Sequence, residues 1–188
     1  MEKRAREGFG ARVHAPIADM PAASPEAFAA TWAGHDIIVA VAPDGSPVGF
    51  AAATPVDAFL HLAELSVDPD HGRKGLGSAL VAAVDGLARE RGLAGVTLTT
   101  FRDVPFNAPF YAGLGFAELP LADASDQLRQ RFHAEIPPHV TAPTVTAAFS
   151  PGDPPPTCPP RRGFSCSAPV EGTRAGAMLR QSLCRNVT

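Results

Sequence analysis

The stretch from residue 62 to residue 80 limits the possible folds of this chain more than any other part of the sequence. It begins with an apolar segment that ends at Pro69, and proline cannot continue a strand ladder. Gly72, Gly75 and Gly77 follow, and glycines let the backbone turn sharply and approach a ligand closely. The apolar residues then recur at helical spacing, at Leu76, Leu80, Val84 and Leu87. The stretch therefore predicts a strand, a tight loop and a helix.

A loop of this kind delivers backbone N–H groups to a helix N-terminus, where free donors and the helix dipole attract anions. Arg73 and Lys74 add positive charge, so the sequence predicts a phosphate-bearing ligand. A nucleotide P-loop is excluded, because Ser78 and Ala79 follow the last glycine and the required Lys and Ser or Thr are misplaced. A dinucleotide fingerprint would need glycine in place of Leu80. The alternative that this is a glycine-rich turn that binds no ligand is not excluded by the loop alone.

A second segment, from Thr100 to Phe116, favours the ligand-binding interpretation. It contains Asn107, then a Phe-Tyr pair that ends at Tyr111, then Leu-Gly-Phe. With Val-Asp-Pro at residues 67–69 and Gly-Leu-Gly at residues 75–77, it resembles the two cofactor segments of the GNAT superfamily of N-acetyltransferases. The resemblance covers about residues 24 to 121. The family has Gln or Arg where this chain has Gly72, and the next residue, Arg73, is a substitute for that charge.

The resemblance implies an α/β fold of mixed α+β type. Its central sheet is mixed and mostly antiparallel, with flanking helices and one parallel strand pair that splays apart. In that fold the pantetheine arm of acetyl-CoA inserts between the splayed strands and bonds to their main chain as an added strand would. No metal is implied. The residues that the resemblance assigns to acetyl-CoA are Leu65, Ser66, Val67, Gly72, Arg73, Lys74, Gly75, Leu76, Gly77, Ser78 and Asn107.

Local patterns predict the other elements. Ser24, Pro25 and Glu26 are typical of a helix start, and we expect a helix over about 25–33. Asn107 is expected to cap a short helix that runs to Leu114. A strand that follows a helix favours parallel pairing with the strand before that helix. Strands are expected at 37–41, 48–52, 60–67, 96–100 and 116–121, with a further one at 144–149, and longer helices at 75–91 and 124–135.

Acetyl transfer from a thioester to an amine needs a base for the amine proton and a donor for the departing thiolate. By the resemblance, Tyr111, the only tyrosine in the chain, is the candidate acid. Glu64 and His61 are the candidate bases. Their separation on one strand places them on opposite faces, so that only one could face the substrate. Each of these residues also has a non-catalytic alternative. Tyr111 could simply pack against the sheet, Glu64 could be a solvated surface carboxylate, and His61 could be an ordinary strand histidine.

The sequence therefore predicts an N-acetyltransferase that moves an acetyl group from acetyl-CoA to a primary amine by direct attack in a ternary complex. The acceptor is a small amine, a protein N-terminus or a lysine. The alternative is a non-catalytic acetyl-CoA-binding module that regulates a partner. Dimerisation is common in the family, so the resemblance allows a homodimer.

Charge and hydropathy limit the classes of partner and the cellular location that we expect. The chain carries a net charge of −3, and five Arg against Asp153 and Glu171 give the last part, residues 136–188, a charge of +3. Residues 1–135 therefore carry −6, which speaks against nucleic-acid binding. No apolar run approaches the ~20 residues of a membrane helix, and no apolar signal segment follows the basic start. We expect a cytoplasmic protein without a membrane partner.

The sequence divides into an irregular segment at 1–23, an acetyltransferase domain at 24–135 and a tail at 136–188. Ten of the twenty prolines lie between Pro137 and Pro169, so the tail is predicted to be disordered. All the cysteines lie in this tail. Their odd number and the lack of a CxxC pair argue against a disulfide framework and a zinc site; they are Cys158, Cys166 and Cys184.

Overall fold

The computed structural model describes residues 24–101, 107–135, 144–149 and 165–167, and the structural statements refer to these residues. The predicted helices and strands all form, with small shifts at their ends. In chain order the elements are α4 Pro25–Thr31, β1 Asp36–Val41, β2 Pro47–Val56, β3 Phe59–Val67, the 3-10 turn η1 Pro69–His71, α5 Leu76–Glu90, β4 Gly95–Phe101, α6 Asn107–Gly113, β5 Ala117–Leu119, α7 Asp126–Glu135, β6 Thr144–Phe149 and β7 Ser165–Ser167.

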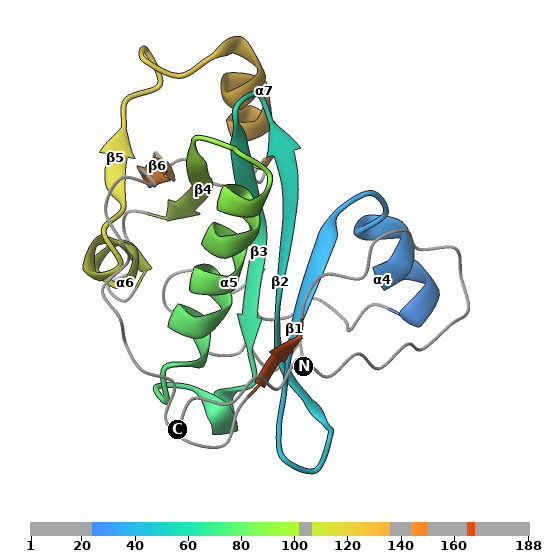
Figure 1. Ribbon diagram of the computed structural model, residues 1–188. Coiled ribbons are helices and arrows are strands. Elements are labelled where there is room, and N and C mark those ends of the chain that lie inside the picture. The colour runs from blue at the N-terminus through green and yellow to red at the C-terminus, as the bar shows by residue number, and fades with distance from the viewer. Residues whose placement is uncertain (1–23, 102–106, 136–143, 150–164, 168–188) are drawn as a thin grey trace.

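The strands form one mixed sheet in the order β5-β6-β4-β3-β2-β1-β7 (Figure 1). β3 and β4 pair in parallel, because α5 connects them and a helical crossover returns the chain to the same end of the sheet. The other described pairs are antiparallel. This confirms the predicted fold, a mostly antiparallel sheet with flanking helices.

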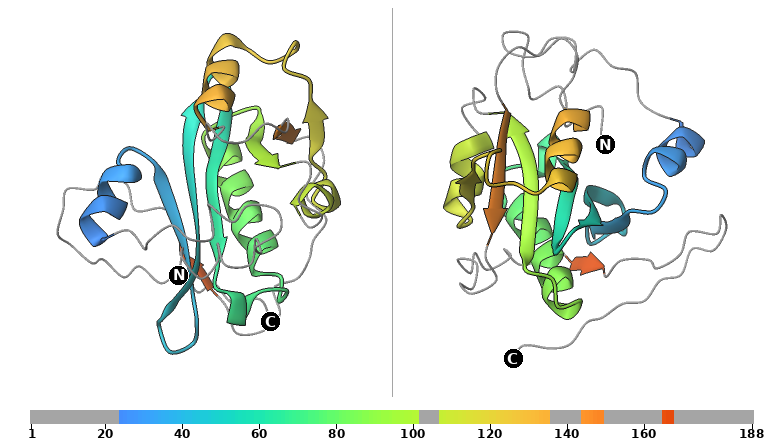
Figure 2. Two further views of the ribbon diagram at one scale, coloured as in Figure 1. Left: turned by 180° about the vertical axis from the view of Figure 1, so that it is seen from behind. Right: turned by 90° about the horizontal axis from the view of Figure 1, so that it is seen from above.

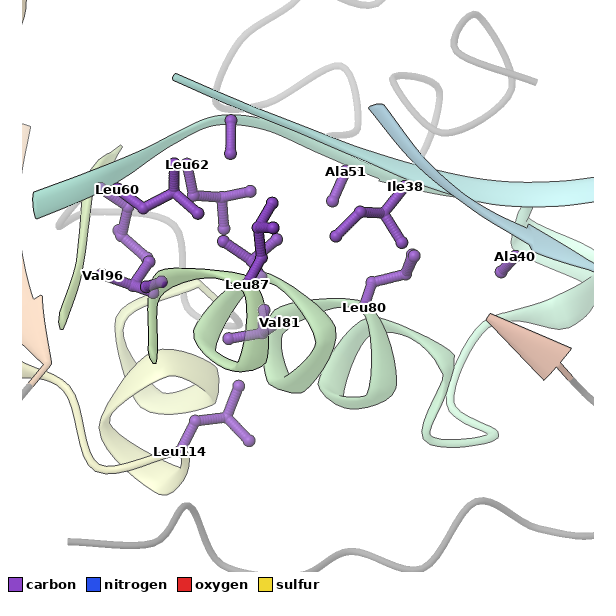
Figure 3. Packing of buried hydrophobic residues seen from close by; sticks show 14 of the residues in the cluster. Ile38, Ala40, Ala51, Leu60, Leu62, Leu80, Val81, Leu87, Val96 and Leu114 are labelled. Atoms are coloured by element: carbon purple, nitrogen blue, oxygen red, sulfur yellow. The ribbon is translucent and has the colours of Figure 1, made fainter. Parts of the chain in front are cut away.

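Helix α5 packs against one face of the sheet and forms the main core with it. Leu80 and Val84 of α5 are completely buried, and so are Leu60 of β3 and Val96 of β4. They belong to one apolar cluster, and Figure 3 shows Leu80 and Leu87 of α5 directed at the strands. Full burial of one such side chain contributes about 1.5–3 kcal/mol. This packing fixes the start of α5, and hence the glycine-rich loop, relative to β3.

The opposite face of the sheet carries α4 and α7. The Phe50 ring of β2 lies 5.3 Å from the Phe28 ring and 6.2 Å from the Trp32 ring, both near α4. Val56, near the end of β2, packs with Leu128 of α7. Figure 2 shows α4 beside β1 and α7 over the end of the sheet where β3 begins. These two helices therefore cover part of the sheet face that points away from α5.

Ser125 fixes the beginning of α7 to the turn between β2 and β3. Its Oγ accepts a hydrogen bond from the Leu128 N–H at 3.2 Å, as a helix cap does. The same hydroxyl donates to the Asp57 carboxylate in the turn. The last turn of α7 is held separately, by a contact between Glu135 and His61 of β3.

The sheet extends past the predicted domain boundary at residue 135. β6 confirms the expected strand at 144–149 and lies between β4 and β5. β7 lies within the tail that was predicted to be disordered, yet it pairs with residues 39–41 of β1. A segment of only three residues carries too little pattern to predict such a strand. The segment 1–23 and most of the tail lie outside the described residues.

None of the described helices is both long enough and apolar enough to cross a membrane.

Candidate active site

The glycine-rich loop leads into the N-terminus of α5. Gly75 precedes the helix with a φ of 84°, a left-handed conformation that glycine adopts without strain. Because glycine has no side chain, the first N–H groups of α5 lack a side-chain cap. Arg73 is exposed, and Lys74 Nζ donates a hydrogen bond to the Asp70 main-chain oxygen at 2.8 Å. Uncapped donors beside two cations form the arrangement that binds anions.

β3 and β4 separate halfway along their length. Within the described part of the chain, their parallel pairing ends at Leu62 and Leu98, although β3 continues to Val67 and β4 to Phe101. We call the two unpaired edges, residues 63–67 of β3 and 99–101 of β4, the wedge. Main-chain groups along such edges can bond to an inserted extended ligand. The predicted splayed pair is therefore present.

The loop, the wedge and α6 meet at one point. A Cβ atom on Gly77 would lie 3.3 Å from Phe110 Cζ in α6 and 4.0 Å from Leu65 Cδ2 in β3. Leu65 and Gly77, both predicted to bind acetyl-CoA, thus lie next to each other and to a residue of the second predicted segment. Asn107 was predicted to cap α6 from the position before the helix. In the structure it is instead the first residue of α6.

Tyr111 lies in an aromatic group at the same point. Its ring centroid is 5.0 Å from that of Phe110 and 5.7 Å from that of Phe116, both in edge-on contact. Burial raises the pKa of the Tyr111 phenol, and the negative charge of Glu64 raises it further. The phenol therefore keeps its proton at neutral pH and is available as a hydrogen-bond donor.

Glu64 and His61 lie on the same face of the sheet, so the prediction of opposite faces was wrong. His61 is paired with Thr54 of β2, and Glu64 with Ala52. The register shifts between these pairs, which makes Ala63 an extra residue, a β-bulge. The bulge changes the alternation of side chains, and both candidates point away from α5. Beyond the bulge, Ser66 Oγ donates to Glu64 Oε1 at 2.7 Å.

His61 is nearly inaccessible, with 1% of its surface exposed. Its Nδ1 lies 3.0 Å from Thr97 Oγ1 in β4. Its Nε2 lies 3.1 Å from both carboxylate oxygens of Glu135 at the end of α7. This pattern fits a ring that donates from Nε2 to the carboxylate and accepts at Nδ1 from the hydroxyl. With both nitrogens engaged, His61 cannot touch an acceptor directly.

Glu135 connects His61 to a second histidine. Its Oε1 accepts a hydrogen bond from Arg131 Nε at 2.7 Å, and Arg131 Nη2 lies 3.3 Å from His35 Nε2. Burial alone would raise the pKa of Glu135, but the hydrogen bond from His61, together with Thr99 and the charge of Arg131, holds it below its usual range. Glu135 is therefore ionised at neutral pH and joins α7 to β3.

Sequence reasoning did not find Glu135, Arg131 or Thr99. The helical spacing of Leu128 and Phe132 places Arg131 and Glu135 one turn apart on one side of α7. It gives no sign that this side meets His61, which lies 74 residues earlier.

His35 makes a pH effect on stability predictable. Burial lowers the pKa of His35, and the nearby Arg131 charge lowers it further. On acidification the unfolded chain therefore takes up this proton first, near pH ~6.5, so stability falls as the pH drops below that value. We expect His35→Gln to show a smaller loss of melting temperature between pH 7.5 and pH 5.5 than the unchanged protein. An equal or larger loss in the variant would contradict the assignment.

Comparison with known proteins identifies the family of the chain. A model of the Acetyltransferase (GNAT) family matches residues 11–116, more than half of the 188 residues. The ribosomal-protein-S18-alanine N-acetyltransferase of Escherichia coli has a similar fold, with a TM-score of 0.51 and 21% identity over 70% of this chain and 79% of that one. A GNAT-family acetyltransferase of Staphylococcus aureus Mu50 gives a TM-score of 0.54 and 15% identity over 80% and 93%. The PaiA N-acetyltransferase of Thermoplasma acidophilum gives 0.51 and 15% over 79% and 87%. By its family match and its fold, the chain belongs to the GNAT family of acetyltransferases.

Proposed function

We propose that the protein is an N-acetyltransferase that moves an acetyl group from acetyl-CoA to a primary amine by direct attack in a ternary complex. The observation that carries this proposal is the wedge, which has an anion-binding loop at one end and Tyr111 and Glu64 beside it. Acetyl-CoA matches both the loop and the wedge. Its pyrophosphate suits the anion-binding loop, and its long, amide-containing arm, which ends in the thioester, suits the wedge. Family membership supports acetyl transfer, and the choice of an amine rests on the site.

In the proposal, acetyl-CoA lies along β3. The pyrophosphate meets the uncapped N–H groups of α5, with Arg73 and Lys74 close by. The arm bonds to the main chain of residues 63–67, whose other edge is used by β2. The Thermoplasma acidophilum neighbour was solved in complex with coenzyme A, which is consistent with such a ligand on this fold.

The acceptor amine must lose a proton before or as it attacks the thioester carbon. Glu64 is the proposed base, because it is partly exposed and points to the face opposite α5. Its negative charge also raises the pKa of Tyr111. The nitrogen forms the new amide bond, the carbon–sulfur bond breaks, and the amine proton passes to Glu64. His61 does not contact the acceptor in this scheme.

Tyr111 stabilises the departing thiolate by a hydrogen bond. A thiol has a pKa near ~8.5, below that of an ordinary tyrosine at ~10, and the Tyr111 pKa is raised further. Full proton transfer from the phenol to sulfur would therefore be uphill. A phenol that stays protonated is a good donor to a developing negative charge, and the thiolate then takes its proton from solvent.

Replacing Glu64 with glutamine tests the base. We expect kcat/KM for a primary amine to fall by about 10²-fold at neutral pH, within the usual range for a general base. The loss should shrink as the pH rises toward the amine's own pKa, because the free amine then needs no base. The control is Glu90→Gln, an exposed carboxylate at the end of α5. A loss that is equal at every pH would mean that Glu64 is structural.

A thiol-release assay with acetyl-CoA and a panel of primary amines and alcohols tests the activity itself. We expect release with amines only, and binding of acetyl-CoA by calorimetry without any amine. Tight cofactor binding with no release from any acceptor would favour a regulatory acetyl-CoA-binding module instead.

A further inference from the structure

Thr99 is the first residue of β4 beyond its last pair with β3. The pairing ends at Leu98, so Thr99 lies at the closed end of the wedge. Thr97 points away from α5, toward His61, and Thr99 points the same way because side chains alternate along a strand. Its Oγ1 is buried and has no hydrogen-bond partner among the described residues. A buried hydroxyl without a hydrogen-bond partner costs about 1–3 kcal/mol, so a ligand that supplies the missing hydrogen bond to Thr99 would be favoured.

Glu135 is a fixed anion on this same side of the sheet. Its side chain is 21% exposed, and its position is set by His61 and Arg131. Oε1 accepts hydrogen bonds from both of these residues, whereas Oε2 accepts one from His61 alone within the described part of the chain. A carboxylate oxygen can accept about two hydrogen bonds, so Oε2 has capacity for a further donor.

Thr99 and Glu135 are close to each other. The Thr99 hydroxyl is among the groups that favour the ionised form of Glu135 and lower its pKa, although no hydrogen bond of ordinary geometry joins them. Together they offer a negative charge and an unused hydroxyl oxygen beside the end of the wedge. A protonated amine, with three N–H donors and a positive charge, matches that pair.

We propose that Glu135 and Thr99 form the site that receives the protonated amine of the acceptor, and that His61 and Arg131 act as positioning residues for Glu135. This inference rests on the proposed function and narrows its substrate class to amines that are cationic in solution. Glu135 binds the ammonium, and Thr99 accepts a hydrogen bond from one of its N–H groups. The ammonium then loses one proton to solvent, which frees the nitrogen lone pair for attack, and Glu64 takes the second proton as the amide bond forms and the carbon–sulfur bond breaks. Arylamines, which are neutral at pH 7, gain nothing from Glu135.

The test measures binding, so that it does not depend on turnover. Benzylamine, cationic at neutral pH, and aniline, which is neutral, are titrated by calorimetry into the full chain loaded with coenzyme A. We expect Glu135→Gln to weaken benzylamine binding by about tenfold, the effect of losing a charge-assisted hydrogen bond, with aniline binding changed less than twofold. Thr99→Val should weaken benzylamine binding by about threefold to tenfold. Coenzyme A affinity should stay within twofold in both variants.

Glu90→Gln is again the matched carboxylate control, and melting temperatures show whether each variant folds. Equal weakening of benzylamine and aniline by Glu135→Gln would overturn the proposal, because it would mean a general structural effect. Unchanged benzylamine binding in both variants would also overturn it, as would a lack of benzylamine binding to the unchanged protein. If Glu135→Gln does not fold, Thr99→Val decides by the same comparison. A selective loss of benzylamine binding without acetyl transfer from any amine would support this site and refute the proposed activity alone.

Discussion

Replacing Tyr111 with phenylalanine is expected to lower kcat by about 10²–10³-fold, the usual effect of removing one donor to a charge that develops in the transition state. The ring remains, so its edge-on contacts with Phe110 and Phe116 survive. The Michaelis constant for acetyl-CoA should change little, because the proposed contacts with the arm and the phosphates lie on β3 and α5. An equal fall in kcat and kcat/KM would mark an interaction made only in the transition state.

A structural role for the Tyr111 hydroxyl predicts a different outcome. A buried hydroxyl with some other partner contributes about 1 kcal/mol to stability. Its loss would lower the melting temperature and leave turnover nearly normal. Measuring both quantities on the same variant separates the two roles, and full activity with lowered stability would mean that another group stabilises the thiolate.

The electrical link between Tyr111 and Glu64 can be measured separately. Tyr111 is the only tyrosine in the chain, so an ultraviolet titration of phenol ionisation reports on it alone. The negative charge of Glu64 raises the pKa of Tyr111, and Glu64→Gln should therefore lower it. An unchanged titration would place Glu64 too far from Tyr111 for the two to act at one reacting centre.

The sequence was sufficient to predict the central architecture. The glycines of the loop and the helical spacing after them are local signals, so the order of β3, loop and α5 could be predicted directly. The parallel pairing of β3 and β4 followed from their helical connection. The role of Tyr111 could not be derived in this way. That role was predicted from the resemblance and stays a prediction, and the structure adds that the charge of Glu64 raises the pKa of Tyr111.

Two features of the site lay beyond sequence reasoning for physical reasons. Strict alternation along a strand puts His61 and Glu64 on opposite faces, and a single extra residue at Ala63 reverses this. Nothing about alanine marks a bulge in advance. The contact between His61 and Glu135 is a tertiary one, made by packing α7 over the start of β3. Local patterns predict that α7 exists, but they carry no information on what its last turn touches.

Replacing Gly77 with valine is expected to weaken acetyl-CoA binding by tenfold or more, a loss of at least about 1.4 kcal/mol. A Cβ at this position would lie 3.3 Å from Phe110 Cζ, closer than carbon atoms normally pack. The Phe110 ring must then shift, and it is in contact with Tyr111. The valine methyl groups would also crowd the N–H groups that receive the pyrophosphate.

Gly86→Val is the matched control for this change. Gly86 lies in the same helix, and a Cβ there would have no neighbour within 4 Å. The same substitution should therefore leave acetyl-CoA affinity within twofold, and it should not destabilise α5, because valine has a higher helix propensity than glycine. Calorimetric titration of acetyl-CoA into both variants makes the comparison. Equal affinities would remove the N-terminus of α5 from the cofactor site.

Gly75→Val separates strain from contact in the same loop. A Cβ on Gly75 would meet nothing within 4 Å, but its φ of 84° is a conformation that side chains rarely adopt. The change should destabilise the fold by about 1–2 kcal/mol, seen as a lower melting temperature. Gly77→Val, which has no such backbone strain, should lower it less while weakening the cofactor more. If both variants lost stability and affinity in proportion, the loop would be a structural turn, and the anion site would have to be sought elsewhere along the wedge.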